Sequence, residues 1–345
     1  MSTFVVSTLA DSGDGSLRAA IEAANAASTP STIQFSVSGT IVLASDLPAI
    51  SQTVALDGTT APGHVAGGAP VVELNCNGNA GLTFATGADG SQLLGMAIGN
   101  ASGNGVTLDA SRITLAGNYV GLGLGGTALS NSGDGVYVAA TSSGNDIGSN
   151  PSAASGVVSN VISNNVGNGI SFHGSAHNTL VDNYIGTDPT GTVAMPNGGN
   201  GIWLTDGSDA NEIGGTAYTD TSTGAVNDPT GDKGSTTPVF VVPLLGYLVS
   251  GNGANGILID SGSQNNDLNG NFVGTTADGN SALGNAQDGV AINGANNNWL
   301  VGCDFSQNPF VYYNVLSGNG GNGLHITDSN NITVQANFFG IGANN

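Results

Sequence analysis

The residues of this sequence best suited to bind a ligand are aromatic and imidazole side chains at regular spacing. Trp203, one of only two tryptophans, and Tyr137 stand at corresponding positions of strand-like segments, and His173 lies in the segment between them. Residues between the two apolar positions of a short strand face outward. Because flat aromatic faces suit the faces of sugar rings, we predict a carbohydrate-binding surface of Trp203, Tyr137, His173, Asp206 and Asp209.

Acidic residues close behind Trp203 indicate a second kind of chemistry. Asp206, Asp209 and Glu212 follow it within the same segment, and carboxylate oxygens are the ligands that Ca²⁺ prefers. The sequence therefore predicts a calcium site formed by these three residues, although no cofactor is required. The alternative is a tryptophan covered by a loop and surrounded by solvated turn acids.

The charge balance excludes several classes of partner. Against 24 acidic residues the chain has three Lys and Arg residues, which gives a net charge of −21. Binding to phosphate backbones needs clustered basic residues, and an anionic membrane surface attracts basic segments. No apolar run approaches the length of a membrane span. We therefore predict no nucleic-acid partner and no membrane insertion.

An internal repeat specifies the elements that position these side chains. A glycine followed by apolar-x-apolar recurs mostly every 30 to 34 residues, with one interval of 24 and one of 55. Alternation over such a short run indicates a strand with one buried face, and repetition at a fixed period indicates a solenoid. The repeated glycines are Gly81, Gly105, Gly135, Gly169, Gly201, Gly256, Gly289 and Gly323.

Asparagines recur at the same period and support this interpretation. An asparagine at the same turn of successive coils can bond to the coils on either side and form a ladder. The column consists of Asn145, Asn178, Asn211, Asn266, Asn298 and Asn331. Gly and Asn are thus expected at the corners, with Ile and Leu stacked inside.

We expect one domain over residues 1–345. Residues 1–35 are predicted to form an N-terminal cap with one short helix, for which Ser16 is the N-cap candidate. The long interval in the repeat indicates a loop insertion at 217–245, and solenoid insertions are frequently functional. The last repeat stops partway through a unit, so we expect a chain truncated at the C-terminus.

The units "NYIGTDPTG" and "NVLSGNGGNGL" and the cap "STLADSGDGSLRAAIEAANA" resemble right-handed parallel β-helix repeat proteins of bacterial surface or secreted type. The resemblance implies an all-β, pectin-lyase-like fold: a single-stranded right-handed parallel β-helix of about ten coils with an N-terminal capping helix. It does not specify an activity, because this fold carries lyases, hydrolases, epimerases, tail proteins and adhesins.

The catalytic patterns of such enzymes are missing. Neither Arg112 nor Lys233 sits in a lyase-like motif, and no Asp-Asp pair of hydrolase type occurs. Asp109 and Asp260 should lie four coils apart, roughly 19 Å, which is too far for a glycosidase pair. We therefore assign no catalytic residue.

The leading hypothesis is a non-enzymatic, monomeric segment of a bacterial extracellular or cell-surface protein. It would act as an adhesin or stalk that binds a polysaccharide or another cell surface. One alternative is a polysaccharide lyase or glycoside hydrolase that works along the Trp203 face. Another is a calcium-stabilised spacer without a ligand of its own.

Overall fold

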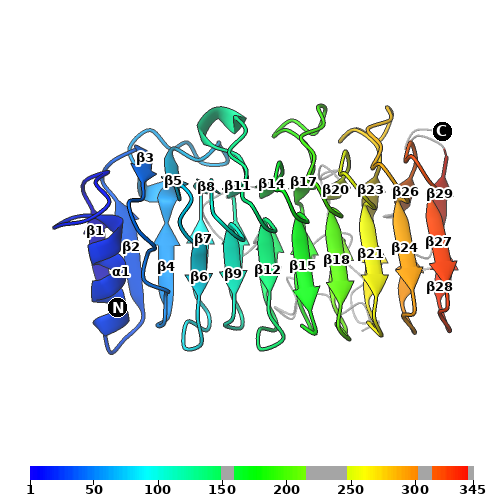
Figure 1. Cartoon of the computed structure of the whole chain (residues 1–345), viewed down its shortest axis with the longest axis horizontal. Helices are drawn as coiled ribbons and strands as arrows, with labels where there is room; N and C mark the ends of the chain where they lie inside the picture. The colour runs from blue at the N-terminus through cyan, green and yellow to red at the C-terminus, as the bar shows by residue number, and fades with distance from the viewer. Residues whose placement is uncertain (149–158, 215–246, 302–312, 341–345) are drawn as a thin grey trace, which may run out of the picture.

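The computed structural model describes residues 1–148, 159–214, 247–301 and 313–340, and these residues form a solenoid of three parallel sheets. Every strand pair within the sheets is parallel, and successive strands of one sheet come from successive coils (Figure 1). The all-parallel arrangement and the presence of only one α-helix among the described residues confirm the predicted parallel β-helix. With 11, 10 and 8 strands in the three sheets, the expectation of about ten coils is also confirmed.

Sheet A has strands β1 (Ser2–Val6), β2 (Ser31–Phe35), β4 (Val54–Asp57), β7 (Gln92–Leu94), β10 (Thr114–Ala116), β13 (Asp146–Gly148), β16 (Thr179–Val181), β19 (Glu212–Gly214), β22 (Asp267–Asn269), β25 (Trp299–Val301) and β28 (Thr333–Gln335). Sheet B has β3 (Gly39–Val42), β5 (Val72–Asn75), β8 (Met96–Gly99), β11 (Tyr119–Val120), β14 (Val161–Ile162), β17 (Tyr184–Ile185), β20 (Tyr247–Val249), β23 (Asn271–Val273), β26 (Asn314–Leu316) and β29 (Asn337–Phe339). Sheet C has β6 (Leu82–Phe84), β9 (Val106–Leu108), β12 (Val136–Val138), β15 (Ile170–His173), β18 (Ile202–Thr205), β21 (Ile257–Asp260), β24 (Val290–Asn293) and β27 (Leu324–Thr327).

The core is a stack of aliphatic side chains that point inward from all three sheets. In sheet C the inward positions flanking each outward residue are almost fully buried, as at Ile170, Phe172, Ile202 and Leu204. The parallel register places each of these side chains on the equivalent residue of the next coil. Each coil therefore depends on its neighbours for burial, as in other solenoids.

The repeated glycines are required by close approach between coils. A Cβ on Gly169 would lie 2.6 Å from the carbonyl oxygen of Gly201, and one on Gly201 would lie 2.4 Å from Cγ1 of Val249. Neither glycine has a positive φ. Their function therefore differs from the predicted one: they do not turn corners but leave room where two successive coils stack.

The predicted asparagine ladder is present, with one correction. Asn178 donates its amide nitrogen to Oδ1 of Asn211 at 2.7 Å, and Asn211 donates to Oδ1 of Asn266 at 2.9 Å. Asn331 is out of register with this column: it bonds to Asn297, whereas Thr333 pairs with Trp299. At this turn the structure aligns each residue with the one 34 positions later, as Trp299 with Thr333. Asn331 is only 33 positions after Asn298 and so falls one position short of the column.

Two further buried ladders were missed, although their period is visible in the sequence. One follows sheet A and the other precedes sheet C, and both join side-chain amides of successive coils. The first contains Asn118, Asn160 and Asn183, then Asn271, Asn314 and Asn337. The second contains Asn131, Asn165, Asn197, Asn252, Asn285 and Asn319.

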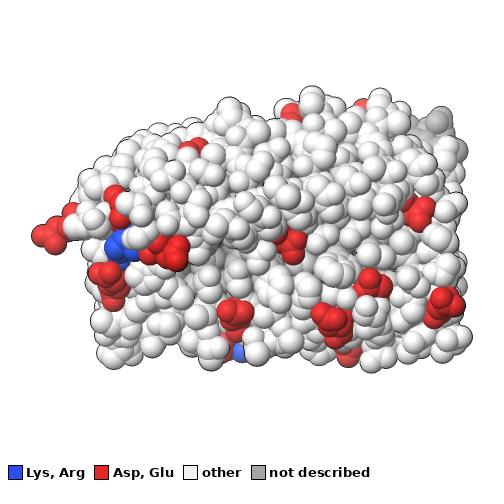
Figure 2. Space-filling view, viewed as in Figure 1, with Lys and Arg blue, Asp and Glu red and all other residues white. Residues whose placement is uncertain are grey.

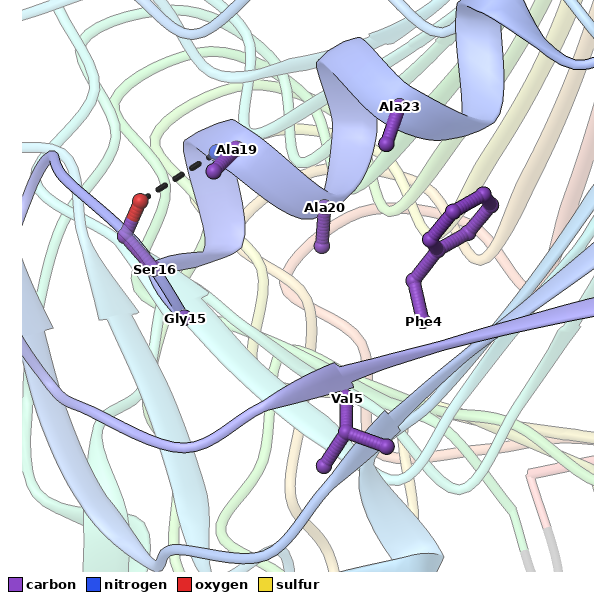
Figure 3. Close-up of a pocket in the computed structure, with 7 residues that line it drawn as sticks. All are labelled: Phe4, Val5, Gly15, Ser16, Ala19, Ala20 and Ala23. Atoms are coloured by element: carbon purple, nitrogen blue, oxygen red, sulfur yellow. Dashed lines mark hydrogen bonds between the residues drawn. The ribbon is translucent and has the colours of Figure 1, made fainter.

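Helix α1 (Leu17–Ala26) covers the N-terminal end of the solenoid (Figure 1). Ser16 is its N-cap, as predicted, and its Oγ accepts a hydrogen bond from the backbone N–H of Ala19 at 3.2 Å (Figure 3). The residues assigned to the cap also include β1 and β2, which extend sheet A by two strands. A shallow hollow between α1 and β1 is lined by Phe4, Val5, Gly15, Ser16, Ala19, Ala20 and Ala23 (Figure 3).

The outer face of sheet B is covered by loops. Short antiparallel bridges close three of these loops, at Leu122 with Ala128, Thr187 with Ala194 and Thr275 with Ala282. A second apolar cluster forms on this side of the sheet and includes Tyr119, Tyr184 and Leu248. The outward side chains of sheet C are partly exposed, so its outer face is a better candidate for a binding surface than that of sheet B.

Candidate functional site

The outer face of sheet C carries a row of ring side chains from three successive coils. Tyr137 of β12 pairs in register with Ser171 of β15, and Ser171 pairs with Trp203 of β18. The prediction that Tyr137 and Trp203 share one outward column, two coils apart, is thus confirmed. The residues that continue this column are Leu258, Ala291 and His325.

The ring of His173 lies between the two aromatic side chains. Its centroid is 4.6 Å from that of Tyr137, with nearly parallel planes, and 5.3 Å from that of Trp203, with the rings edge to face. The sequence predicts that Tyr137 and Trp203 lie about two coil spacings apart, roughly 10 Å. The imidazole of His173 fills this space. A ligand can lie across the row but cannot enter between the two aromatic rings.

Asp206 fixes the orientation of His173. Its Oδ2 lies 3.0 Å from Nδ1 of the imidazole. Asp206 follows β18 directly and has a φ of 56°, in the left-handed region, which turns the chain sharply at the end of the strand. The side chain of Asp206 is 64% exposed and that of His173 is 22% exposed, so the carboxylate is the more accessible of the two groups.

Ser171 forms the floor beneath the ring of His173. It is fully buried, and its hydroxyl donates to Oδ2 of Asp134 at 2.6 Å. The other carboxylate oxygen of Asp134 accepts from the side-chain amide of Asn168. Because Ser171 is small, it leaves the space that the imidazole occupies. Its hydroxyl group hydrogen-bonds to Asp134 in the turn that precedes sheet C.

A further carboxylate, Asp260, lies at the end of β21, the strand next to that of Trp203 on the side away from Tyr137. Asp260 follows Ile259, which pairs with Leu204 on the neighbouring strand. Its Oδ1 is inaccessible and has no hydrogen-bond partner, and the same holds for Nε1 of Trp203. Sequence reasoning considered Asp260 only as half of a distant catalytic pair and missed its place on the strand next to that of the tryptophan.

The three residues predicted to bind calcium lie on different elements. Asp206 pairs with His173, Asp209 accepts a hydrogen bond from Asn265 in the turn toward sheet A, and Glu212 begins β19 of sheet A. Among the residues that the structure describes, no group of three or more His, Cys, Asp or Glu side chains is placed to hold a metal ion. The described geometry therefore gives the calcium site no support.

On sheet A, Glu212 has an acidic neighbour in the next coil. It pairs in register with Asp267 of β22, which is followed in the same column by Trp299. Burial raises the pKa of Asp267 from 3.8 to about 6, although a hydrogen bond from the backbone of Leu268 opposes the shift. The asparagine column already aligned this pair, since Glu212 and Asp267 directly follow Asn211 and Asn266, but sequence reasoning did not use this alignment.

We expect Asp267→Asn to stabilise the protein at pH 7 and not at pH 4. A folded pKa above the unfolded one means that the native state binds more protons between about pH 4 and pH 6, so this carboxyl lowers stability as pH rises through that window. A difference of about two pKa units corresponds to about 3 kcal/mol at most, and we expect a gain of about 2 kcal/mol. Urea unfolding followed by far-UV circular dichroism at both pH values measures it.

The exposed Glu22→Gln substitution in α1 serves as the control and should leave the urea midpoint unchanged at both pH values. An equal gain for Asp267→Asn at pH 7 and pH 4 would show that packing, and not the ionisation of this carboxyl, determines the effect.

The predicted loop insertion at 217–245 lies outside the described residues. Within the described part of the chain, no helix is long and apolar enough to cross a membrane. The five residues predicted to bind carbohydrate divide into four that meet in one row, namely Tyr137, His173, Trp203 and Asp206, and one that does not. Asp209 lies in the following turn, where it bridges Ala176 and Gln264.

No family model and no curated protein matches the sequence. Among solved structures, the chain is similar to a mutant of the periplasmic alginate epimerase AlgG, with 14% identity, a TM-score of 0.45, and coverage of 89% of this chain and 71% of the epimerase. It is also similar to the Dettilon tailspike protein, with 15% identity, a TM-score of 0.34, and coverage of 94% and 68%. A third match is the pectate lyase Pel9A, with 16% identity, a TM-score of 0.31, and coverage of 98% and 78%.

Proposed function

We propose that this protein is an extracellular β-helix that binds an extended glycan across the outer face of sheet C. The observation that supports the proposal is the row formed by Tyr137, His173 and Trp203, with Asp206 at its edge. The residues come from three consecutive coils, so their spacing is fixed by the hydrogen bonding of a continuous sheet. Such a surface is preorganised, which lowers the entropy cost of binding.

The row offers the two kinds of contact that a sugar needs. Ring faces and edges of partly exposed aromatic residues contact the apolar faces of pyranose rings, and the 64% exposed carboxylate of Asp206 accepts hydrogen bonds from hydroxyl groups. Leu258 and Ala291 continue the column as a smooth, mostly apolar track. A linear polysaccharide lying along the solenoid can therefore contact several coils at once.

We place this binding activity in an adhesin or stalk of a bacterial surface or secreted protein. The near-absence of Lys and Arg from the sequence supports a binding role over a lyase, because a lyase of this fold would employ a basic side chain to stabilise the reacting centre. The solenoid is well suited to a stalk, since each added coil lengthens it without changing its cross-section.

A second candidate is a polysaccharide-modifying enzyme, and the contact between His173 and Asp206 favours it. A carboxylate bonded to Nδ1 orients an imidazole and leaves Nε2 to exchange a proton with a substrate. The phenol of Tyr137, stacked on that imidazole, would be the nearest second proton-transfer group. For such an enzyme, the substrate must lie over the row of rings so that its reacting atoms reach Nε2 of His173.

Screening the full chain on a glycan array tests the proposal, and the ligands that bind are then incubated with the protein. New reducing ends report hydrolysis, ultraviolet absorbance of unsaturated sugars reports elimination, and proton NMR reports epimerisation. We expect binding without turnover. Turnover that His173→Ala abolishes would establish the enzyme instead, and the absence of binding to any glycan would refute the proposed function.

A further inference from the structure

The charge of the surface restricts which glycans the row can accept. The described residues contain two basic side chains, and both already have acidic partners: Arg18 bonds to Asp11 at 2.7 Å and Arg112 to Asp89 at 3.4 Å. On the face shown in Figure 2, acidic side chains are spread along the solenoid, whereas basic ones occur only near the N-terminal end and at one place on the lower edge. Neither arginine belongs to the ring row.

Acidic side chains surround the row itself. Asp134 accepts a hydrogen bond from Ser171 of the row, Asp206 lies at the exposed edge, and Asp260 lies on the strand next to that of Trp203. Asp134 receives hydrogen bonds from Ser171 and Asn168, which compensate part of its charge. Oδ1 of Asp260 receives none. One carboxylate oxygen on the strand next to that of Trp203 therefore has no hydrogen bond to offset its charge.

A uronate placed over Trp203 would bring its carboxylate close to Asp206 and Asp260. Like charges within a few ångströms across an interface cost several kcal/mol, and the net charge of −21 adds a longer-range repulsion over about one Debye length. An uncharged sugar avoids both costs. Its hydroxyl groups can donate to Asp206, which an anionic substituent cannot do.

We propose that the ring row selects uncharged glycans and rejects polyuronates, with Asp260 as a specificity-determining residue. This inference rests on the proposed function of the same site and adds the substrate class. Selectivity is a difference between two affinities, so a site can become specific by weakening the binding of the competitor. A like charge placed near the bound ligand weakens the binding of an anionic competitor in this way. Asp260 therefore weakens the binding of uronates and contributes little to the affinity for the uncharged glycan.

The experiment compares oligosaccharides of equal length, using gluco-, manno- and galacto-hexaoses against hexamers of galacturonate and mannuronate. Binding to the full chain is measured by calorimetry in buffer with EDTA at physiological ionic strength. We expect at least one neutral series to bind and the uronates to bind at least about tenfold more weakly, the equivalent of about 1.4 kcal/mol.

The Asp260→Asn variant should reduce the neutral-to-uronate affinity ratio several-fold, because uronates bind more tightly when this charge is removed. Asp14→Asn, at an exposed position before the capping helix, changes the net charge equally and should leave the ratio unchanged. Equal or tighter binding of uronates by the unmodified protein would overturn the inference and leave the proposed function standing. If both variants shift the ratio alike, selection at Asp260 is refuted; if no hexaose binds, the proposed function itself fails.

Discussion

Replacing Asn211 with alanine is expected to lower the free energy of unfolding by about 3 kcal/mol, because the change leaves several buried polar groups without partners. Asn211 is 1% exposed. Its Oδ1 accepts from the backbone N–H of Asn178 at 3.0 Å and from the Asn178 amide at 2.7 Å, while its own amide donates to Ser175 and Asn266. Alanine removes all four bonds and leaves their former partners in a buried site.

Urea unfolding monitored by far-UV circular dichroism measures this loss. Asn330→Ala is a matched control, because the side-chain amide of Asn330 also bonds to a neighbouring coil, through Oδ1 of Asn296 in the preceding coil, but is exposed to solvent. Water replaces lost bonds at an exposed site, so the control should cost less than about 1 kcal/mol. Similar costs for the two variants would mean that the buried ladder is not a principal source of stability.

Substituting Trp203 with alanine is expected to weaken glycan binding about thirtyfold. Loss of an aromatic platform costs about 2 kcal/mol in comparable stacking sites, and each 1.4 kcal/mol is a factor of ten in affinity. The change also removes the edge-to-face partner of His173, so the imidazole loses one of the contacts that hold it over Ser171. Calorimetric titration with the best ligand from the array measures the effect.

Trp299→Ala is the matched control for this experiment. Trp299 is the other tryptophan of the chain, is 39% exposed and stands on sheet A, so its loss should leave the affinity unchanged. Circular dichroism of both variants verifies folding. An unchanged affinity in Trp203→Ala would remove the ring row from the binding site, and a loss of stability without any loss of affinity would assign Trp203 a packing role.

The sequence alone was sufficient to predict the fold because its determinants are local and repeat. Alternating apolar residues predict strands with one buried face. The recurrence of that pattern at a similar spacing predicts a stack of similar coils. The column of outward residues through Tyr137, Ser171 and Trp203 could be predicted for the same reason, since parallel strands in register place equivalent residues side by side. Where one turn departs from the average period, as at Asn331, the prediction was wrong by one residue.

Only the tertiary structure decided what the outward side chains do together. The sequence placed His173 in the coil between Tyr137 and Trp203, but a repeat period fixes Cα positions and not the direction of a ring. The stacking of the imidazole on Tyr137 depends on a neighbour that is buried and small, Ser171, and on the carboxylate of Asp206 in the next turn. These contacts join residues of three coils, so no local pattern records them.

The acidic residues show the same division between sequence and structure. Proximity in sequence grouped Asp206, Asp209 and Glu212, yet a turn of the solenoid sends Glu212 to sheet A, where it meets Asp267 instead. Composition determined that the molecule is strongly acidic. Strand register and packing decided that Asp260 lies on the strand next to that of Trp203, with one carboxylate oxygen inaccessible and without a hydrogen-bond partner. Burial and hydrogen bonding depend on residues that lie far apart along the chain.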